Sequence, residues 1–183
     1  MGLLTTTEIE HVGGFRFAPP GGETMIILGI DPGPTSSAAV LWDTKSEEVK
    51  ASSIEENSLF REKLIAVRDT DPPGMCVIEG ITFYGKVLNS STYETLMFIG
   101  QLREIFYGYY KVVYFPDIAY YFCGSRRGVK TSNINAVLLS RYKKGTKKQP
   151  GPLYGVKGHE MSALAAAIYW WESPTMVDFE KRD

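Results

Sequence analysis

The chain has 183 residues, of which 44% are hydrophobic and 22% are charged, and its formal net charge is −1. These values are typical of a single soluble globular domain with a sizeable core. No apolar run reaches the roughly 18 residues that a bilayer span requires, and no signal peptide is recognisable. The two cysteines, Cys76 and Cys123, lack CxxC spacing. We therefore expect a cytoplasmic protein without a membrane partner, a disulfide framework or a zinc site.

The near-neutral net charge hides an uneven distribution. Residues 118–159 contain no Asp or Glu in 42 positions, whereas the average over the chain would place about five acids there. The same tract contains nine basic residues: Arg126, Arg127, Lys130, Arg141, Lys143, Lys144, Lys147, Lys148 and Lys157. It therefore carries +9 and leaves −10 on the rest of the chain. For so long an acid-free tract we favour a polyanionic partner over a merely solvated basic surface.

The first half of the chain predicts three strands, a helix and a fourth strand. Residues 1–24 lack periodicity and end in Pro-Pro-Gly-Gly before Glu23, so we expect a flexible extension ahead of a domain over residues 25–173 and a tail over 174–183. Apolar or alternating runs then predict strands and a helix, in chain order, at Ile26–Ile30, Ser37–Trp42, Glu48–Ser52, Asn57–Arg68 (the helix) and Met75–Ile78.

The second half predicts a long helix, a fifth strand and two late helices. Ser91 and Glu94 fit a capping box for a helix that runs to Phe106. A strand is expected over Lys111–Phe115, and helices over Ser132–Tyr142 and His159–Trp171. A meander followed by alternating helix and strand predicts an α/β fold with a mixed sheet and helices on both of its faces.

Two acids stand out by their position. Asp31 and Glu79 each follow directly on a strand that is otherwise apolar. If these strands are neighbours in the sheet, both carboxylates emerge near the same edge, where ligand sites of open sheets gather. Paired carboxylates there suit Mg²⁺ or Mn²⁺, and two such ions can support phosphodiester hydrolysis. The alternative is that each acid is a turn residue.

Several segments, in order from Ile26 to Trp171, together resemble the RuvC family of junction resolvases. The opening motif is Ile27–Gly33, and Val77–Gly80 is similar to the family's second acidic motif. The other similar segments are Asn89–Ser91, Ile99–Arg103, Gly124–Arg127 with Lys130, and the closing helix Gly158–Ala165. The long segment Lys144–Gly155 looks more like phage-type relatives.

The resemblance implies an RNase H-like fold and a nuclease that acts on branched DNA, above all four-way (Holliday) junctions, in recombination, repair or phage DNA processing. It implies Mg²⁺ or Mn²⁺, two ions in all, as cofactor, and a homodimer, since symmetric cutting of two strands needs two active sites. The setting would be a prokaryotic cell or a phage-infected host.

The closing helix departs from the family pattern. The family has an acid or a histidine there and an aspartate three residues later, whereas this chain has His159 and Ser162. At about 100° per residue the two share one helix face, so His159 is our third candidate metal ligand and a candidate general base. Glu160 lies on a different face and ranks below His159 as a catalytic residue.

The DNA-binding candidates come from two regions. Phe83 and Tyr84 follow the second acid, where the resembled family carries an aromatic that enters the junction, and core packing is the alternative for both. The others belong to the basic tract: Arg126, Arg127, Lys130, Lys143, Lys144, Lys147 and Lys148.

Two other functions stay open. Asp31–Ser36 also resembles the phosphate loop of the sugar kinase, actin and chaperone ATPase superfamily, but those proteins contain two lobes, for which 183 residues are too few. The second is a junction-binding pseudonuclease that lost catalysis together with the missing carboxylate.

Overall fold

Five strands form one mixed sheet. They are β1 (Ile26–Asp31), β2 (Ser36–Asp43), β3 (Glu48–Glu56), β4 (Met75–Gly80) and β5 (Tyr110–Tyr114). In the computed structural model, which describes residues 24–83 and 89–173, their order is β3-β2-β1-β4-β5. β1, β2 and β3 form an antiparallel meander, and β4 and β5 are added parallel to β1. The predicted mixed sheet is confirmed.

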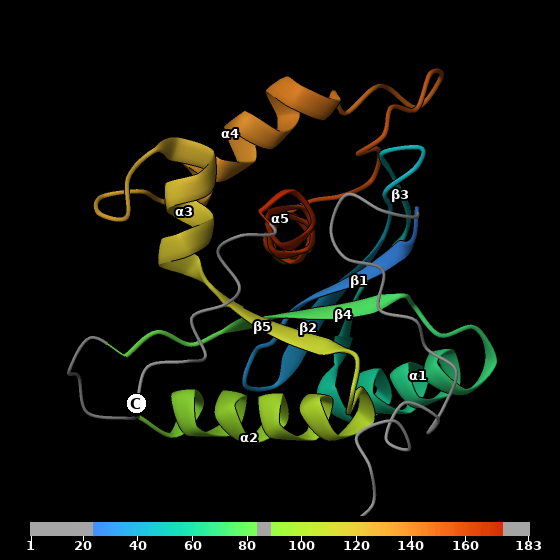
Figure 1. Ribbon diagram of the computed structural model, residues 1–183, viewed down its shortest axis with the longest axis vertical. Helices are drawn as coiled ribbons and strands as arrows, with labels where there is room; N and C mark the ends of the chain where they lie inside the picture. The colour runs from blue at the N-terminus through green and yellow to red at the C-terminus, as the bar shows by residue number, and fades with distance from the viewer. Residues whose placement is uncertain (1–23, 84–88, 174–183) are drawn as a thin grey trace, which may run out of the picture.

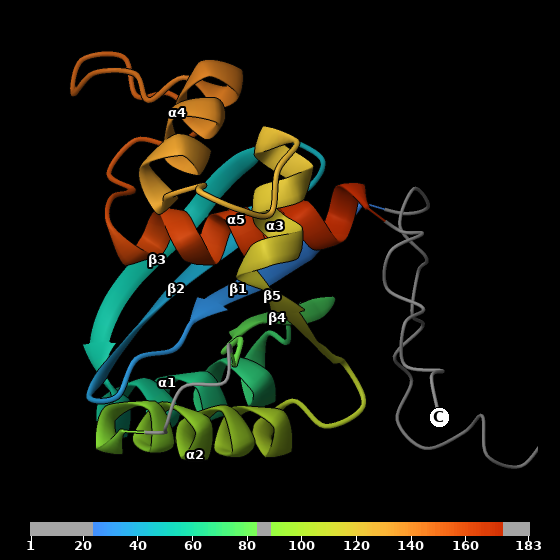
Figure 2. The same ribbon diagram turned by 90° about the vertical axis from the view of Figure 1, so that its left-hand side faces the viewer.

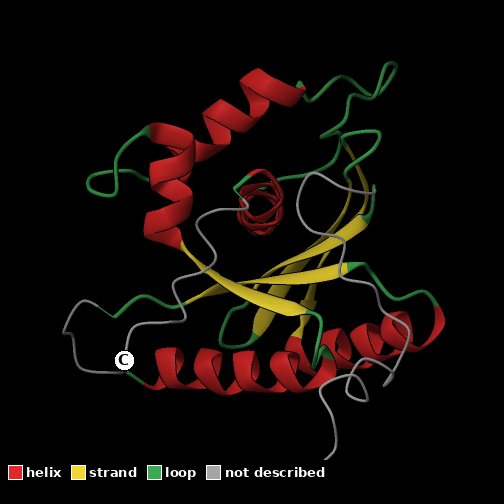
Figure 3. Cartoon of the chain, viewed as in Figure 1, coloured by secondary structure: helices red, strands yellow, loops and turns green. Residues whose placement is uncertain are grey.

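Helices cover both faces of this sheet. They are α1 (Asn57–Thr70), α2 (Ser90–Ile105), α3 (Phe115–Cys123), α4 (Thr131–Tyr142) and α5 (His159–Glu172). α1 and α2 lie on one face, whereas α5 lies directly on the other with α3 and α4 outside it (Figures 1 and 3). Each face therefore has its own buried core.

Helix α5 packs unusually close to the central strand. Its residues are buried from Glu160 to Trp170 apart from Ser162, and four of them are alanines. A Cβ atom on Gly29 of β1 would lie 2.2 Å from the carbonyl oxygen of Ala163. Only glycine allows this approach, which brings the first turn of α5 to the end of β1.

Some element boundaries differ from the prediction. β3 continues to Glu56 rather than Ser52, because pairing with β2 extends along its whole length. The N-cap of α2 is Asn89, whose side chain accepts a hydrogen bond from the backbone N–H of Thr92, so the predicted Ser91 capping box is wrong. Phe115 begins α3 instead of ending β5.

No bounds were predicted for α3, although its ends carry ordinary signals. Pro116 lies in the first turn, where a missing N–H costs no hydrogen bond. Gly124 ends the helix at φ 71°, a left-handed conformation that glycine adopts without strain. The loop that follows the helix contains Arg126, Arg127 and Lys130, the first basic residues of the tract.

The predicted terminal segments and a possible membrane-spanning helix are the remaining features to compare with the structure. The predicted extension over residues 1–24, Thr24 excepted, and the predicted tail over residues 174–183 lie outside the described ranges. None of the helices within those ranges combines the length and apolar character that crossing a membrane requires.

Candidate active site

Asp31 and Glu79 lie on neighbouring strands at the same edge of the sheet. β1 and β4 run parallel with Ile30 paired to Ile78, so the next residue of each strand is one of the two acids. Both line an open pocket of about 290 Å³. Its other lining residues are Pro32, Gly80, Ile81, Thr82 and Phe115. The sequence prediction that the two carboxylates share an edge thus agrees with the strand register.

The pocket disfavours two negative charges. Burial and, to a smaller extent, the charge of Asp31 together raise the pKa of the Glu79 carboxyl to about 8. Burial also raises the pKa of Asp31, although hydrogen bonds from His159 and Ser162 act against the shift. At neutral pH the pair therefore tends to retain a proton, and a cation between the two groups would replace it.

His159, the first residue of the helix α5 that packs on the sheet, lies beside Asp31. Its Nδ1 atom lies 2.8 Å from Oδ2 of Asp31. An ionised Asp31 only accepts hydrogen bonds, so Nδ1 carries a proton, and in the neutral imidazole the lone pair is then on Nε2. The imidazole side chain is 78% exposed, against 17% for Asp31. His159 thus offers a basic nitrogen to solvent while its ring is oriented by a buried carboxylate.

Ser162 belongs to the same site. It is the partly exposed residue within the buried run of α5, one turn after His159, and its hydroxyl lies close enough to Asp31 to lower the pKa of that carboxyl. The expected shared face of His159 and Ser162 is thus directed at Asp31.

Glu160 is occupied elsewhere. Its side chain is buried, and its carboxylate accepts a hydrogen bond from the backbone N–H of Lys157 at 3.1 Å. An acid in the first turn that binds a free N–H group is a typical helix-capping contact. The geometry therefore gives Glu160 a role in starting α5, and it leaves our second choice for catalysis outside the pocket.

Thr82 is a pocket residue that sequence reasoning missed. Its Oγ1 atom is buried and has no hydrogen-bond partner among the described residues. A buried hydroxyl without a partner costs free energy, so such groups usually serve a ligand or a water molecule. The only sequence signal was its position three residues after Glu79.

Comparisons with known proteins identify the fold. No protein-family model matches the chain, and no curated protein is similar to it in sequence. A solved structure of T. thermophilus RuvC in complex with a Holliday junction substrate matches it with a TM-score of 0.61 at 16% identity, covering 79% of this chain and 92% of that chain. The chain has a RuvC-like fold.

A second RuvC structure agrees with the first. A structure titled as Thermus thermophilus RuvC matches with a TM-score of 0.59 at 15% identity and covers 81% of this chain and 96% of that chain. The predicted RNase H-like α/β architecture is confirmed. At this level of identity the likeness extends to the fold alone.

The acidic pocket offers protein ligands for one divalent ion rather than for two. Among the described residues, no three His, Cys, Asp or Glu side chains gather closely enough to hold a metal ion together. Asp31 and Glu79 nevertheless supply two partly buried carboxylates, and the Thr82 hydroxyl, which has no partner among the described residues, lies in the same pocket. Mg²⁺ is commonly held by one or two carboxylates, with waters and substrate phosphates as its other ligands. The donor set therefore suits Mg²⁺ or Mn²⁺.

The basic tract occupies the layer outside α5. Ser125–Lys130 form the loop before α4, and Lys143–Gly151 form a hairpin after it, closed by a bridge between Gly145 and Pro150. The 12 residues of α4 separate the two segments by about 18 Å at 1.5 Å per residue. In Figure 2 the hairpin projects toward the side on which β1 ends and α5 begins.

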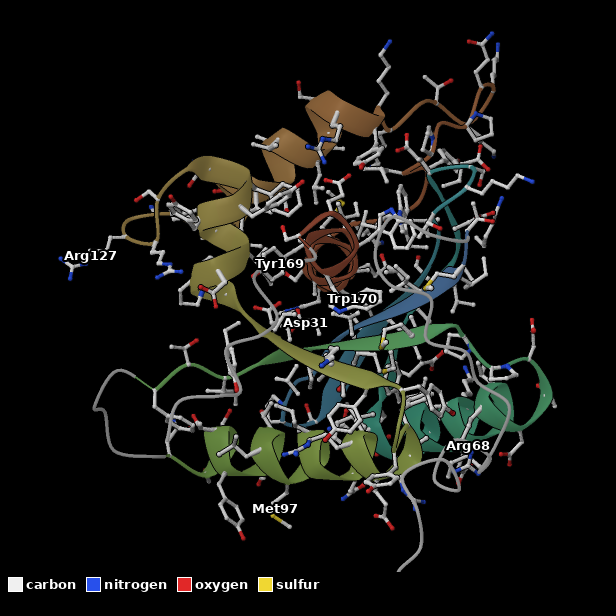
Figure 4. All side chains as sticks on the ribbon, in the orientation of Figure 1. Asp31, Arg68, Met97, Arg127, Tyr169 and Trp170 are labelled. Atoms are coloured by element: carbon white, nitrogen blue, oxygen red, sulfur yellow. The ribbon has the colours of Figure 1, made fainter. Side chains whose placement is uncertain are left out.

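The basic side chains differ in their pairing. Arg126 forms a salt bridge with Asp117 at 2.9 Å, and its guanidinium lies over the ring of Tyr120. Figure 4 shows the neighbouring Arg127 directed away from the body of the protein. Within the described ranges no carboxylate pairs with Arg127 or with five lysines, namely Lys130, Lys143, Lys144, Lys147 and Lys148. These six side chains are therefore the stronger candidates for binding phosphate.

Phe83 lies at the surface beside the acids. Its side chain is 51% exposed, so the core-packing alternative is wrong for this residue. It lines a second cavity that adjoins the acidic pocket. Tyr84, the other predicted aromatic, lies outside the described residues.

Proposed function

We propose that this protein is a divalent-metal-dependent endonuclease that cleaves phosphodiesters in branched DNA, above all four-way (Holliday) junctions. The observation that carries the proposal is the adjacent pair of partly buried acids, Asp31 and Glu79, at one edge of a RuvC-like sheet. The proposal includes a homodimer, a phage-type origin, and a role in recombination, repair or phage DNA processing in the cytoplasm of a prokaryotic cell or an infected host.

The chain's own residues have distinct parts in this reaction. Asp31 and Glu79 would hold Mg²⁺ or Mn²⁺, which when bound polarises the phosphate and makes water more acidic. A second ion would depend on ligands from the DNA phosphate, because the described pocket offers two carboxylates. His159 takes the proton of the attacking water at Nε2 while Asp31 holds Nδ1–H. Ser162 helps to fix the Asp31 carboxylate.

The basic tract would bind the DNA backbone. Lysine and arginine side chains that neutralise phosphates release counterions, and this supplies affinity without sequence preference. Arg127, Lys130 and the lysines of the hairpin are exposed at both ends of α4. They are therefore suited to hold duplex arms while the acidic pocket receives the strand to be cut.

One observation favours a second candidate, the junction-binding pseudonuclease. Ser162 occupies the position at which the resembled family has an aspartate, and here it gives Asp31 a hydroxyl neighbour instead of a third carboxylate. The kinase-like alternative gains no support, since the described residues build one sheet rather than two lobes.

A cleavage assay separates the candidates. The nuclease should cut a synthetic four-way junction with Mg²⁺ or Mn²⁺ and not with EDTA, and Asp31→Asn should abolish cutting while junction binding stays nearly intact. Binding without cutting under both metals would establish the pseudonuclease. Full cutting by Asp31→Asn would remove the site assignment.

A further inference from the structure

Four polar side chains from three helices meet at the end of α5 that is remote from the acidic pocket. Glu172, the last residue of α5, accepts a hydrogen bond from the hydroxyl of Tyr121 in α3. It also accepts one from the hydroxyl of Tyr142 in α4 at 3.1 Å, and it forms a salt bridge with Arg141 of α4. This group, the Glu172 cluster, thus joins both outer helices to the helix that begins at His159.

The Glu172 cluster is partly shielded from water. The Glu172 side chain is 25% exposed, and Tyr142 is buried. The Tyr142 ring packs edge-on against Trp42 of β2 with 5.1 Å between the ring centroids, and the Arg141 guanidinium carbon lies 5.7 Å from the centroid of the same tyrosine ring. Burial raises the pKa of Tyr142 to about 12, so its hydroxyl remains a hydrogen-bond donor at neutral pH. Charge-assisted hydrogen bonds in such surroundings hold side chains more firmly than exposed ion pairs do.

The Glu172 cluster lies at the base of the lysine hairpin, Lys143–Gly151. Arg141 and Tyr142 are the last two residues of α4, and Lys143 follows directly. Lys143 has φ 51° and ψ 131°, a conformation that is strained for a residue with a Cβ atom. Such a conformation persists only where surrounding contacts impose it. We therefore attribute the direction in which the hairpin leaves α4 to the contacts of the last helical turn.

Other contacts hold the rest of α4 and the far end of the hairpin. Ile134 and Leu138 are buried in the core between α4 and the sheet. Residues 143–150 are exposed, whereas Leu153 beyond them is fully buried. Loss of the Glu172 cluster should therefore leave the protein folded and α4 docked, and it should free only the last turn of α4 and the near end of the hairpin.

We propose that Glu172 is a positioning residue for DNA binding, which holds the lysine hairpin in the orientation that engages the phosphate backbone. This inference rests on the proposed function and concerns its DNA-binding layer instead of the acidic pocket. A carboxylate repels phosphates, so Glu172 acts through Arg141 and Tyr142. Long-range electrostatics and positioning then predict opposite effects of removing its charge. The first predicts tighter DNA binding, and the second predicts weaker binding.

Junction binding by the full chain in EDTA, measured over a range of salt concentrations, tests this inference. Glu172→Gln should weaken binding about tenfold, the equivalent of one charge-assisted hydrogen bond. It should also flatten the log–log salt slope, because fewer lysines reach a phosphate although none has been removed. Glu172→Asp keeps the charge but withdraws it from its partners, so it should weaken binding in the same direction. Glu172→Gln should have no further effect on the slope in a chain that carries Ala at Lys143, Lys144, Lys147 and Lys148.

Asp117→Asn is the matched control. It also removes one negative charge that pairs with an arginine of the basic tract, but its partner Arg126 lies in the loop before α4 and not at the hairpin. Asp117→Asn should therefore strengthen junction binding, as electrostatics alone predicts. Mg²⁺ should raise the melting temperature of Glu172→Gln as much as that of wild type, since the acidic pocket lies at the other end of α5.

Two results would overturn this inference while the nuclease assignment survives. One is unchanged or tighter junction binding by Glu172→Gln together with normal cleavage, which would show that the carboxylate acts through its charge alone. The other is a loss of the Mg²⁺ response in that variant along with its DNA binding, which would show a general defect in packing. If wild type neither binds nor cuts junctions, the proposed function fails and this inference fails with it.

Discussion

The imidazole of His159 and the carboxylate of Asp31, 128 positions apart in the chain, lie within hydrogen-bond distance at 2.8 Å. This contact connects the first residue of α5 to the last residue of β1. One side of the imidazole ring therefore faces solvent, and the other side faces Asp31, which lines the acidic pocket. Because of this contact, the ring of His159, which the sequence motif alone identifies as a candidate general base, is oriented by Asp31.

Removing the imidazole should slow chemistry more than binding. His159→Ala is expected to lower kcat for junction cleavage about 10²–10⁴-fold, the usual contribution of a general base, while junction affinity stays close to wild type. Glu160→Gln is the matched control, because an amide oxygen can still accept the hydrogen bond from Lys157. A His159→Ala variant that cuts at the wild-type rate would show that the ring has no part in proton transfer.

A third carboxylate at Ser162 should couple stability to metal. Because the Ser162 hydroxyl lies near enough to Asp31 to lower its pKa, Ser162→Asp adds charge beside two acids and should lower the melting temperature in EDTA. Mg²⁺ should restore the melting temperature, and the variant should bind Mg²⁺ more tightly than wild type. Ser162→Asn has similar size without the charge and should show neither effect. A loss of stability that metal does not rescue would separate Ser162 from the metal site.

The partly buried carboxyl groups of Asp31 and Glu79 should make the metal-free protein less stable as pH rises. The folded-state pKa of Glu79 is about 8 and its ordinary value is 4.5. Below pH 4.5 the Glu79 carboxyl is protonated in both the folded and the unfolded state. Between pH 4.5 and about pH 8 it is protonated only in the folded state, so the free energy of unfolding falls as pH rises through this window. Above about pH 8 the free energy of unfolding levels off. Glu79→Gln should remove most of this fall in melts recorded in EDTA. Mg²⁺ should stabilise wild type more at pH 8.5 than at pH 6, and identical pH profiles for the two proteins would contradict the raised pKa.

The lysine hairpin should account for part of the salt dependence of DNA binding. Replacing Lys143, Lys144, Lys147 and Lys148 with Ala should flatten the log–log salt slope by up to about 0.9 per lost phosphate contact. In a matched pair, Arg127→Ala should flatten it more than Arg126→Ala, since Arg126 is already neutralised by Asp117. An unchanged slope in the fourfold variant would place the hairpin away from DNA.

Two glycines should respond in opposite directions to the same substitution. Gly29→Ala places a methyl group against the Ala163 carbonyl and should cost about 1–3 kcal/mol of stability, or more if α5 cannot shift. Gly100→Ala lies on an exposed face of α2 with no atom within 4 Å of the new Cβ, and it should add about 0.5–1 kcal/mol. Thermal or denaturant melts of the two variants give the comparison, and equal effects would show that α5 is not seated on Gly29.

The acidic pair was predictable because it depends on local pattern and simple topology. Apolar runs marked β1 and β4, and parallel strands bring their ends to one edge, so Asp31 and Glu79 were found from the sequence. The same periodicity gave the mixed sheet and most helix positions. Boundaries were less accurate where tertiary pairing decides them, as at Glu56 in β3 or at the Asn89 cap.

The rest of the site depends on contacts that no local pattern encodes. The motif placed Ser162 on the His159 face but did not indicate that its hydroxyl acts on the Asp31 carboxyl, and the partner of Arg126 is visible only once α3 is in place. The burial of the Thr82 hydroxyl, without a partner among the residues that the structure describes, likewise results from the packing around it. The tertiary fold therefore decides which charged side chains come together in one site and which are neutralised by an ion pair.

The hairpin has a further property that follows from its connection to the sheet. Its return strand reaches Pro152, whose carbonyl accepts a hydrogen bond from the backbone N–H of Val49 in β3, and the next residue, Leu153, is fully buried. A tensile load applied by DNA to the lysines is therefore transferred to the edge of the sheet six residues before His159. If the hairpin binds DNA as proposed, movements of the DNA arms would displace the hairpin while the imidazole keeps its alignment with Asp31.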